Sequence, residues 1–190
     1  MTSSQFYGVE FQINPRGDFM TVRFAVFIAV SLDGFIARPD GGIDWLEPFH
    51  GEDHGYGVFF AGVDALVIGR GTYDTVVGFP EWPYGGKRLI VCTGRPANPR
   101  HGEELWSGQP RALADRLERE GVRRVYLDGG ALIRSFLREG LVDELTIDVV
   151  PLILGSGRPL FGSGLPEIPL RFVESKSYPS GLVQVRYQRV

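Results

Sequence analysis

Residues 64–74 read DALVIGRGTYD, a short apolar run that enters a glycine, an arginine and a threonine. A continuous apolar run of this length is typical of a strand buried on both faces, as in a parallel sheet. The glycine at position 69 and the polar residues after it indicate that a short helix begins at once. A strand that passes directly into a helix is the unit from which α/β domains are built.

The residues on either side of this stretch repeat the same order. Four buried strands are predicted in the first two thirds of the chain, at 22–30, 64–69, 87–93 and 123–130. Helices are predicted between and after them, at 52–61, from Gly71 or Thr72, at 110–120 and at 131–139. The remaining residues predict a strand at 144–154, broken at Pro151, and a hairpin of 170–178 with 182–190. We therefore expect one α/β domain with a mixed, mostly parallel sheet and an antiparallel C-terminal hairpin.

The composition of the chain fits a soluble globular protein. Its 190 residues are 43% hydrophobic and 23% charged, and no apolar run is long enough for a membrane-spanning helix. A formal net charge of −3 disfavours a bulk nucleic-acid binder. The single cysteine, Cys92, excludes an internal disulfide and a multi-cysteine metal site, which fits a reducing cytoplasm. We expect a cytoplasmic protein with a small-molecule substrate and neither a nucleic-acid nor a membrane partner.

The first 20 residues show no sustained period and no signal-peptide core. Because the first convincing strand begins just after Met20, we expect residues 1–20 to be an N-terminal extension and residues 21–190 to be the domain. Met20 is then a candidate for the natural start. The alternative is an arm that packs on the surface of the domain.

The 26 glycines are the unusual feature of the composition, and several lie where strands run into helices. At Gly69 to Thr72 and again at Gly129-Gly130, the free amides of a helix start and the absent side chains would let a phosphate approach the backbone. Arg70 and Thr72 add a guanidinium and a hydroxyl. The alternative interpretation is that these glycines serve only as strand-to-helix turns.

Two further stretches follow predicted strands. Thr93 and Arg95 come just past the third strand and could recognise an additional phosphate, such as the 2′-phosphate of NADP; the alternative is an exposed loop arginine. Residues 31–45 contain two Asp-Gly pairs and form either a surface excursion or a mobile lid beside the carboxyl edge of the sheet.

The ordered set of motifs resembles the RibD C-terminal domain (riboflavin-type reductase) family, in its stand-alone bacterial branch, within the dihydrofolate reductase-like superfamily. The matching pieces are FIAVSLDGFIA, DALVIGRGTYD, RLIVCTGRP, VYLDGGALIRSFL, LVDELTIDVVPLILGSGRPLF and the closing hairpin. The resemblance implies a three-layer α/β/α fold, a homodimer and an NADPH-dependent reductase. It carries a cofactor-binding role to ten positions: Ala29 at the nicotinamide; Ile36 and Ala37 in the closing loop; Gly69, Arg70 and Thr72 at phosphates; Thr93 and Arg95 at the ribose phosphate; and Gly129 and Gly130 at the pyrophosphate.

A catalytic carboxylate is the least determined part of the site. Dihydrofolate reductases carry one on the helix before the Gly-Arg junction, and Asp53 has a similar spacing here, with Glu52 adjacent. Either side chain could help a water molecule protonate a bound heterocycle. The alternative for Asp53 is helix capping or solvent exposure. His50 and His54 flank the same place and are expected at the surface or the substrate edge, so no metal site is predicted.

We therefore expect an NADPH-dependent reductase of a small heterocyclic or ribosylated pyrimidine- or pteridine-type substrate. The alternative is an NADPH- or nucleotide-binding module without turnover. The substrate itself is not predicted, because the expected pocket-lining stretches, residues 43–60 and the loop from Val77 to Gly86, carry no motif that could be transferred from the family. For the homodimer, the candidate interface consists of Leu160, Phe161 and the apolar face of 146–154.

Overall fold

The computed structural model describes residues 4–6, 9–11 and 21–190. Strands β1 (Ser4–Phe6) and β2 (Val9–Phe11) pair with each other in antiparallel orientation. Most of the expected N-terminal extension, including Met20, lies outside the described residues, so the assignment of residues 1–20 stays a prediction.

The domain is built on an eight-stranded sheet with the order β11-β12-β9-β3-β8-β5-β6-β7. The strands are β3 (Arg23–Ser31), β5 (Ala65–Gly69), β6 (Arg88–Cys92), β7 (Glu104–Trp106), β8 (Arg124–Asp128), β9 (Val142–Val150), β11 (Leu170–Ser177) and β12 (Val183–Arg189). Strand β3 pairs in parallel with both β8 and β9, and β5 to β8 continue in parallel. Only the hairpin β11–β12 joins the sheet in antiparallel orientation, at β9. The predicted mixed, mostly parallel sheet with an antiparallel C-terminal hairpin is confirmed.

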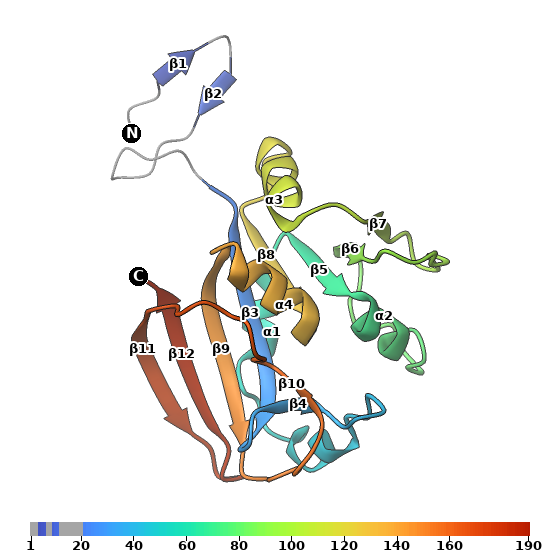
Figure 1. Cartoon of the computed structure of the whole chain (residues 1–190), viewed down its shortest axis with the longest axis vertical. Helices are drawn as coiled ribbons and strands as arrows, with labels where there is room; N and C mark the ends of the chain where they lie inside the picture. Colours follow the sequence, from blue (N-terminus) through green and yellow to red (C-terminus); the bar gives the residue numbers. More distant parts are fainter. Residues whose placement is uncertain (1–3, 7–8, 12–20) are drawn as a thin grey trace.

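Helices cover both faces of this sheet (Figure 1). They are α1 (Tyr56–Ala61), α2 (Arg70–Val76), α3 (Pro110–Arg119) and α4 (Gly130–Arg138). Side chains alternate along a strand, so Phe24 and Val26 of β3 pack with α3 and α4, whereas Ala25 and Phe27 pack with α1 and α2. This alternation of fully apolar strands gives the three layers that the sequence predicts.

Helix α1 is shorter than the predicted helix at 52–61. It begins at Tyr56 because Gly55, its N-cap residue, has a φ of +83°, a left-handed conformation that ends the preceding turn. A 3-10 helix, η1 (Asp44–Phe49), precedes it. The sequence analysis also missed β4 (Phe35–Ala37), β7 and β10 (Arg158–Pro159), since strands of two or three residues show no detectable period.

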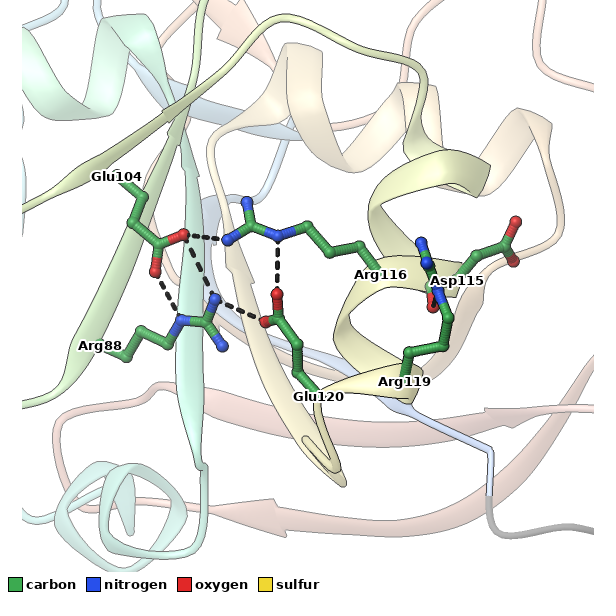
Figure 2. Close-up of polar contacts among 6 residues, drawn as sticks. All are labelled: Arg88, Glu104, Asp115, Arg116, Arg119 and Glu120. Carbon is green, nitrogen blue, oxygen red and sulfur yellow. Dashed lines mark hydrogen bonds and ion pairs between the residues drawn. The ribbon is translucent and has the colours of Figure 1, made fainter. Parts of the chain in front are cut away.

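Edge strand β7 is held by a four-charge network (Figure 2). The carboxylate of Glu104 on β7 bonds the guanidinium groups of Arg88 on β6, at 2.6 Å, and of Arg116 on α3, at 2.5 Å. Glu120, just past α3, bonds the same two arginines at 2.6 and 2.8 Å. The network fixes β7 and the end of α3 against β6, and it thereby anchors the loop of residues 93–103 that joins β6 to β7.

A second small sheet joins the loop after β3 to the segment before β11. Strand β4 pairs antiparallel with β10, and the Leu160 amide donates to the Gly34 carbonyl at 3.0 Å. The Asp33 carboxylate accepts the amides of Leu154, at 3.1 Å, and Gly155, at 2.7 Å. The predicted lid region, residues 31–45, is therefore tied to residues 154–160 in this structure.

The expected dimer interface is only partly available at the surface. Phe161 is 48% exposed, whereas Leu160 is buried in the core with 1% of its surface exposed. Leu160 was wrongly expected at an interface because an apolar residue beside a glycine-rich turn gives no sign of which way it points. Among the described residues, none of the helices has the length and apolar character that crossing a membrane requires.

Candidate active site

A cleft of about 880 Å³ opens at the carboxyl ends of the parallel strands β3, β5, β6 and β8. Ligands bind at this edge in open α/β sheets, because the strands end there and the following helices begin. All ten residues expected to bind the cofactor line this one cleft: Ala29, Ile36, Ala37, Gly69, Arg70, Thr72, Thr93, Arg95, Gly129 and Gly130. Segments spread over about a hundred residues are thus brought to one site.

The two glycine junctions meet in this cleft. Gly129 has a φ of +104°, and a methyl group added there would lie 2.7 Å from the Thr72 hydroxyl oxygen of the other junction. A methyl group on Gly130 would lie 3.0 Å from the Pro159 carbonyl oxygen. Only glycine fits at these two positions, where the starts of α2 and α4 lie side by side.

Four arginines line the cleft: Arg70, Arg95, Arg134 and Arg158. The Arg70 guanidinium is fixed by the Asp74 carboxylate and by the Pro96 carbonyl, each at 2.7 Å. Arg95 is exposed, and its backbone is bonded to the Thr93 hydroxyl. Thr93 and Arg95 thus belong to one tight turn at the end of β6.

Arg134 and Arg158 are cleft residues that the sequence analysis missed. Arg134 on α4 donates to the carbonyls of Pro159, at 2.5 Å, and Leu160, at 3.1 Å. Arg158 donates to the Asp40 carbonyl at 3.0 Å and lies beside Gly71. Arg134 could have been found from its place one turn after Gly130, whereas a two-residue strand such as β10 gives no signal for Arg158. We call the two junctions, the turn at 93–95, Arg134 and residues 157–159 the glycine half of the cleft.

The rest of the cleft is aromatic and apolar. We call it the aromatic half; it is lined by Phe27, Tyr56, Val76, Phe79, Tyr84 and Tyr126, with Asp128 at the boundary next to Gly129. The ring of Tyr56 lies 5.6 Å from that of Phe27 and 6.1 Å from that of Tyr126, both edge-on. The Tyr126 hydroxyl donates to the Phe27 carbonyl at 3.0 Å. These contacts hold the rings as a wall around Asp128.

Asp128 is another cleft residue that the sequence analysis did not single out. Burial raises the pKa of its carboxyl group from 3.8 to about 6, although hydrogen bonding from the Gly129 amide and the Tyr84 hydroxyl acts in the opposite direction. Burial also raises the pKa of Tyr56 to about 12, so its hydroxyl stays neutral. A carboxyl group that titrates near neutrality in a cleft is a typical acid–base candidate. The available signal was a carboxylate directly before the double glycine of a buried strand.

The structure does not bring Asp53 and Glu52 to the cleft. The Asp53 carboxylate accepts the Gly55 amide at 2.8 Å, and Glu52 accepts the Ser180 hydroxyl of the C-terminal hairpin at 2.5 Å. The spacing argument assumed a continuous helix, but these residues form the turn before α1. Among the described residues, helix α1 has no side-chain cap; Asp53 is exposed and bonds within its own turn, in agreement with solvent exposure as its alternative interpretation.

The neighbouring histidines are also away from the cleft lining. His50 is exposed, and the His54 ring packs edge-on against Tyr178 at 4.7 Å. Within the part of the chain that the structure describes, no three histidine, cysteine, aspartate or glutamate residues are grouped as a metal site.

Comparison with known proteins identifies the family. The model of the RibD C-terminal domain family matches residues 24–184. The chain belongs to this family. A Bacillus subtilis protein of uncharacterised function, YwjB, is 40% identical over 174 residues, which cover 90% of this chain and 99% of YwjB. The family resemblance seen in the motifs is confirmed.

Further members of the RibD group agree with this assignment. The crystal structure of a candidate riboflavin biosynthesis protein from Shewanella sp. PV-4 superposes with a TM-score of 0.82 at 34% identity, covering 89% of this chain and 99% of that one. The riboflavin biosynthesis protein RibD of Corynebacterium ammoniagenes is 32% identical over 162 residues, which are 76% of this chain but 46% of RibD. This chain therefore matches less than half of that longer protein.

Proposed function

We propose that the protein is an NADPH-dependent reductase of a small pyrimidine- or pteridine-type heterocycle. The observation that carries this proposal is that one cleft holds both glycine junctions, the Thr93–Arg95 turn and a buried carboxyl group. Membership of the RibD C-terminal domain family supports the same reaction class.

The glycine half fits the phosphates of a dinucleotide. Gly129 and Gly130 carry no side chain that would shield the start of α4, and the first amides of α4 have no partners inside the helix. Arg158 would meet the same phosphates from the side of β10. Arg95 with Thr93 would bind the 2′-phosphate, which would explain a preference for NADPH over NADH.

NADPH would supply a hydride, which carries two electrons, to a carbon of a C=N or C=O bond in the substrate. The matching proton goes to the nitrogen or oxygen of that bond, and the cofactor leaves as NADP⁺. Asp128 would hold or relay this proton, since it lies where the two halves of the cleft meet and its pKa is raised to about 6. The aromatic wall of Tyr56, Tyr84 and Tyr126 would orient the ring and exclude water.

Titration of the purified protein with NADPH and NADH tests the cofactor assignment. We expect binding of NADPH in the micromolar range and weaker binding of NADH. No detectable NADPH binding would refute the proposal.

A screen of pterins, dihydrofolate and ribosylaminopyrimidines for NADPH oxidation then tests turnover. Reduction of any of these compounds supports a reductase. NADPH binding without reduction of any compound would favour a nucleotide-binding module instead.

A further inference from the structure

We propose that the aromatic half of the cleft takes an uncharged or cationic planar heterocycle that carries no phosphate, and that it discriminates against phosphorylated substrates. This inference rests on the proposed function, because it assigns the aromatic half to the substrate and the glycine half to the cofactor. It narrows the substrate to a class that neither the family assignment nor the relatives specify.

The shape and surface of this half favour a flat ring. The side chains of Phe27, Tyr56 and Tyr126 contact one another edge-on, and Phe79 adds a ring that is 39% exposed at the cleft. Aromatic walls stabilise a flat apolar ring by edge-to-face and offset-stacked contacts. A ribose phosphate gains little from such walls, because its oxygens need donors or cations.

All of the arginines that line the cleft belong to the glycine half and none belongs to the aromatic half. Among the residues that line the cleft, the positively charged ones are the four arginines of the glycine half, and hydrogen bonds of the guanidinium group hold three of them there. Arg70 is fixed by Asp74, Arg134 by the Pro159 and Leu160 carbonyls, and Arg158 by the Asp40 carbonyl. A phosphate in the aromatic half would therefore find no counterion among the lining residues of that half.

The charged group next to the aromatic half is a carboxylate, which repels an anion. Asp128 is the acidic residue in the lining, and no arginine, lysine or histidine forms an ion pair with it among the described residues. A phosphate beside it would meet like-charge repulsion in a site that is partly shielded from water. A ring N–H or an amino group, by contrast, could donate to this carboxyl group.

The other polar groups of the aromatic half are tyrosine hydroxyls. The Tyr126 hydroxyl is already used by the Phe27 carbonyl, and that of Tyr84 interacts with Asp128. Burial raises the pKa of Tyr56 and of Tyr84, so both hydroxyls are neutral; the Tyr84 oxygen can still accept a hydrogen bond from a ligand while it donates to Asp128. Neutral donors of this kind suit the carbonyl and ring nitrogens of a pyrimidine or pterin.

The experiment uses matched ligands on the full-length protein. Calorimetry measures the binding of 5-amino-6-ribosylaminouracil and of its 5′-phosphate at about pH 7.5, with and without saturating NADP⁺. The pair 6-hydroxymethyl-7,8-dihydropterin and its phosphate is measured in the same way. We expect each phosphate-free compound to bind at least about tenfold more tightly than its phosphorylated partner, as repulsion of about one charge pair implies.

A variant identifies the cause of the discrimination. Asp128→Asn should reduce the tenfold difference, because it removes the like charge and keeps the size of the side chain. Asp53→Asn removes the same charge outside the cleft and should leave the difference unchanged. If Asp128→Asn does not fold, the comparison of the two ligand pairs on the wild-type protein still decides.

The outcomes separate this inference from the proposed function. Equal or tighter binding of the phosphorylated compounds overturns it, and so does failure of all four compounds to bind. A failure of NADPH to bind overturns the proposed function but not a discrimination measured without cofactor. Retention of the full difference in Asp128→Asn overturns the assigned cause.

Discussion

Asp128→Asn is the substitution that tests the candidate site most directly. Burial raises the pKa of the Asp128 carboxyl group from 3.8 to about 6. At about 1.4 kcal/mol for each pKa unit, the ionised form costs the folded state at most about 3 kcal/mol, and solvent in the cleft reduces this value. Asparagine has nearly the same size and does not titrate, so the variant removes this cost.

The sign of the effect follows from the direction of the pKa change. Because the folded-state pKa lies above the unfolded value, the favourable contribution is present at low pH and is lost as the pH rises through about 6. Between about pH 4.5 and about pH 7.5, about 2 kcal/mol of the 3 kcal/mol is lost. Asp128→Asn should therefore gain about 2 kcal/mol relative to wild type over this interval.

Urea unfolding of both proteins at the two pH values measures this gain. Asp53→Asn is the control, since it changes the net charge equally and lies outside the cleft. A difference between Asp128→Asn and wild type that is the same at both pH values would refute the reasoning.

The same substitution should lower the rate of NADPH oxidation. Loss of a positioned acid–base group typically costs a factor of about 10²–10⁴. The wild-type rate should change around pH 6 as Asp128 titrates, and the residual rate of the variant should lack that change. A wild-type-like pH profile in Asp128→Asn would show that another group handles the proton.

Four further predictions concern cofactor binding, folding and assembly. Arg95→Ala should weaken NADPH binding about tenfold and leave NADH binding unchanged in parallel titrations, because only NADPH carries the 2′-phosphate. Gly69→Ala should fold normally, since its φ of −76° suits any residue, but titration should show weaker NADPH binding. Gly129→Ala should lower the free energy of unfolding by about 1–3 kcal/mol, because the φ of +104° at this position strains any residue other than glycine. Glu104→Gln should lower the stability by about 1–2 kcal/mol in urea unfolding, and by less at high salt, because it opens the ion-pair network. Light scattering should find a homodimer, and Phe161→Asp, on an exposed ring, should shift it towards the monomer.

Each of these four predictions has its own control or its own contradicting result. Arg100→Ala removes an exposed arginine outside the cleft lining and controls for charge, so an equal loss in both variants would contradict the role of Arg95. Gly51→Ala, which meets no atom within 4 Å, controls for Gly69→Ala. A stability loss in Glu104→Gln that does not depend on salt would exclude the ion pairs as its cause. A wild-type monomer at micromolar concentration would refute the dimer.

The sequence alone predicted the layers of the fold and most of the cleft. Long apolar strands followed by glycines, as at DALVIGRG and VYLDGG, carry strong local signals, because burial on both faces demands apolar residues and helix starts demand special turns. The carboxyl ends of parallel strands necessarily share one edge of the sheet. Residues such as Gly69, Thr93 and Gly129 could therefore be placed in one cleft from their positions in the chain.

Tertiary structure decided the catalytic candidate. The sequence favours Asp53 by its spacing from the Gly-Arg junction, and it gives no comparable argument for Asp128, which directly precedes Gly129. The surroundings of the two carboxylates differ: Asp53 is exposed and bonds its own turn, whereas Asp128 lies in the cleft beside the tyrosines, and burial raises its pKa. Arg158 likewise reaches the site only through contacts across the fold, because the two-residue strand β10 leaves no periodic signal in the sequence. Desolvation and charge depend on what packs around a group, and only the folded chain specifies that.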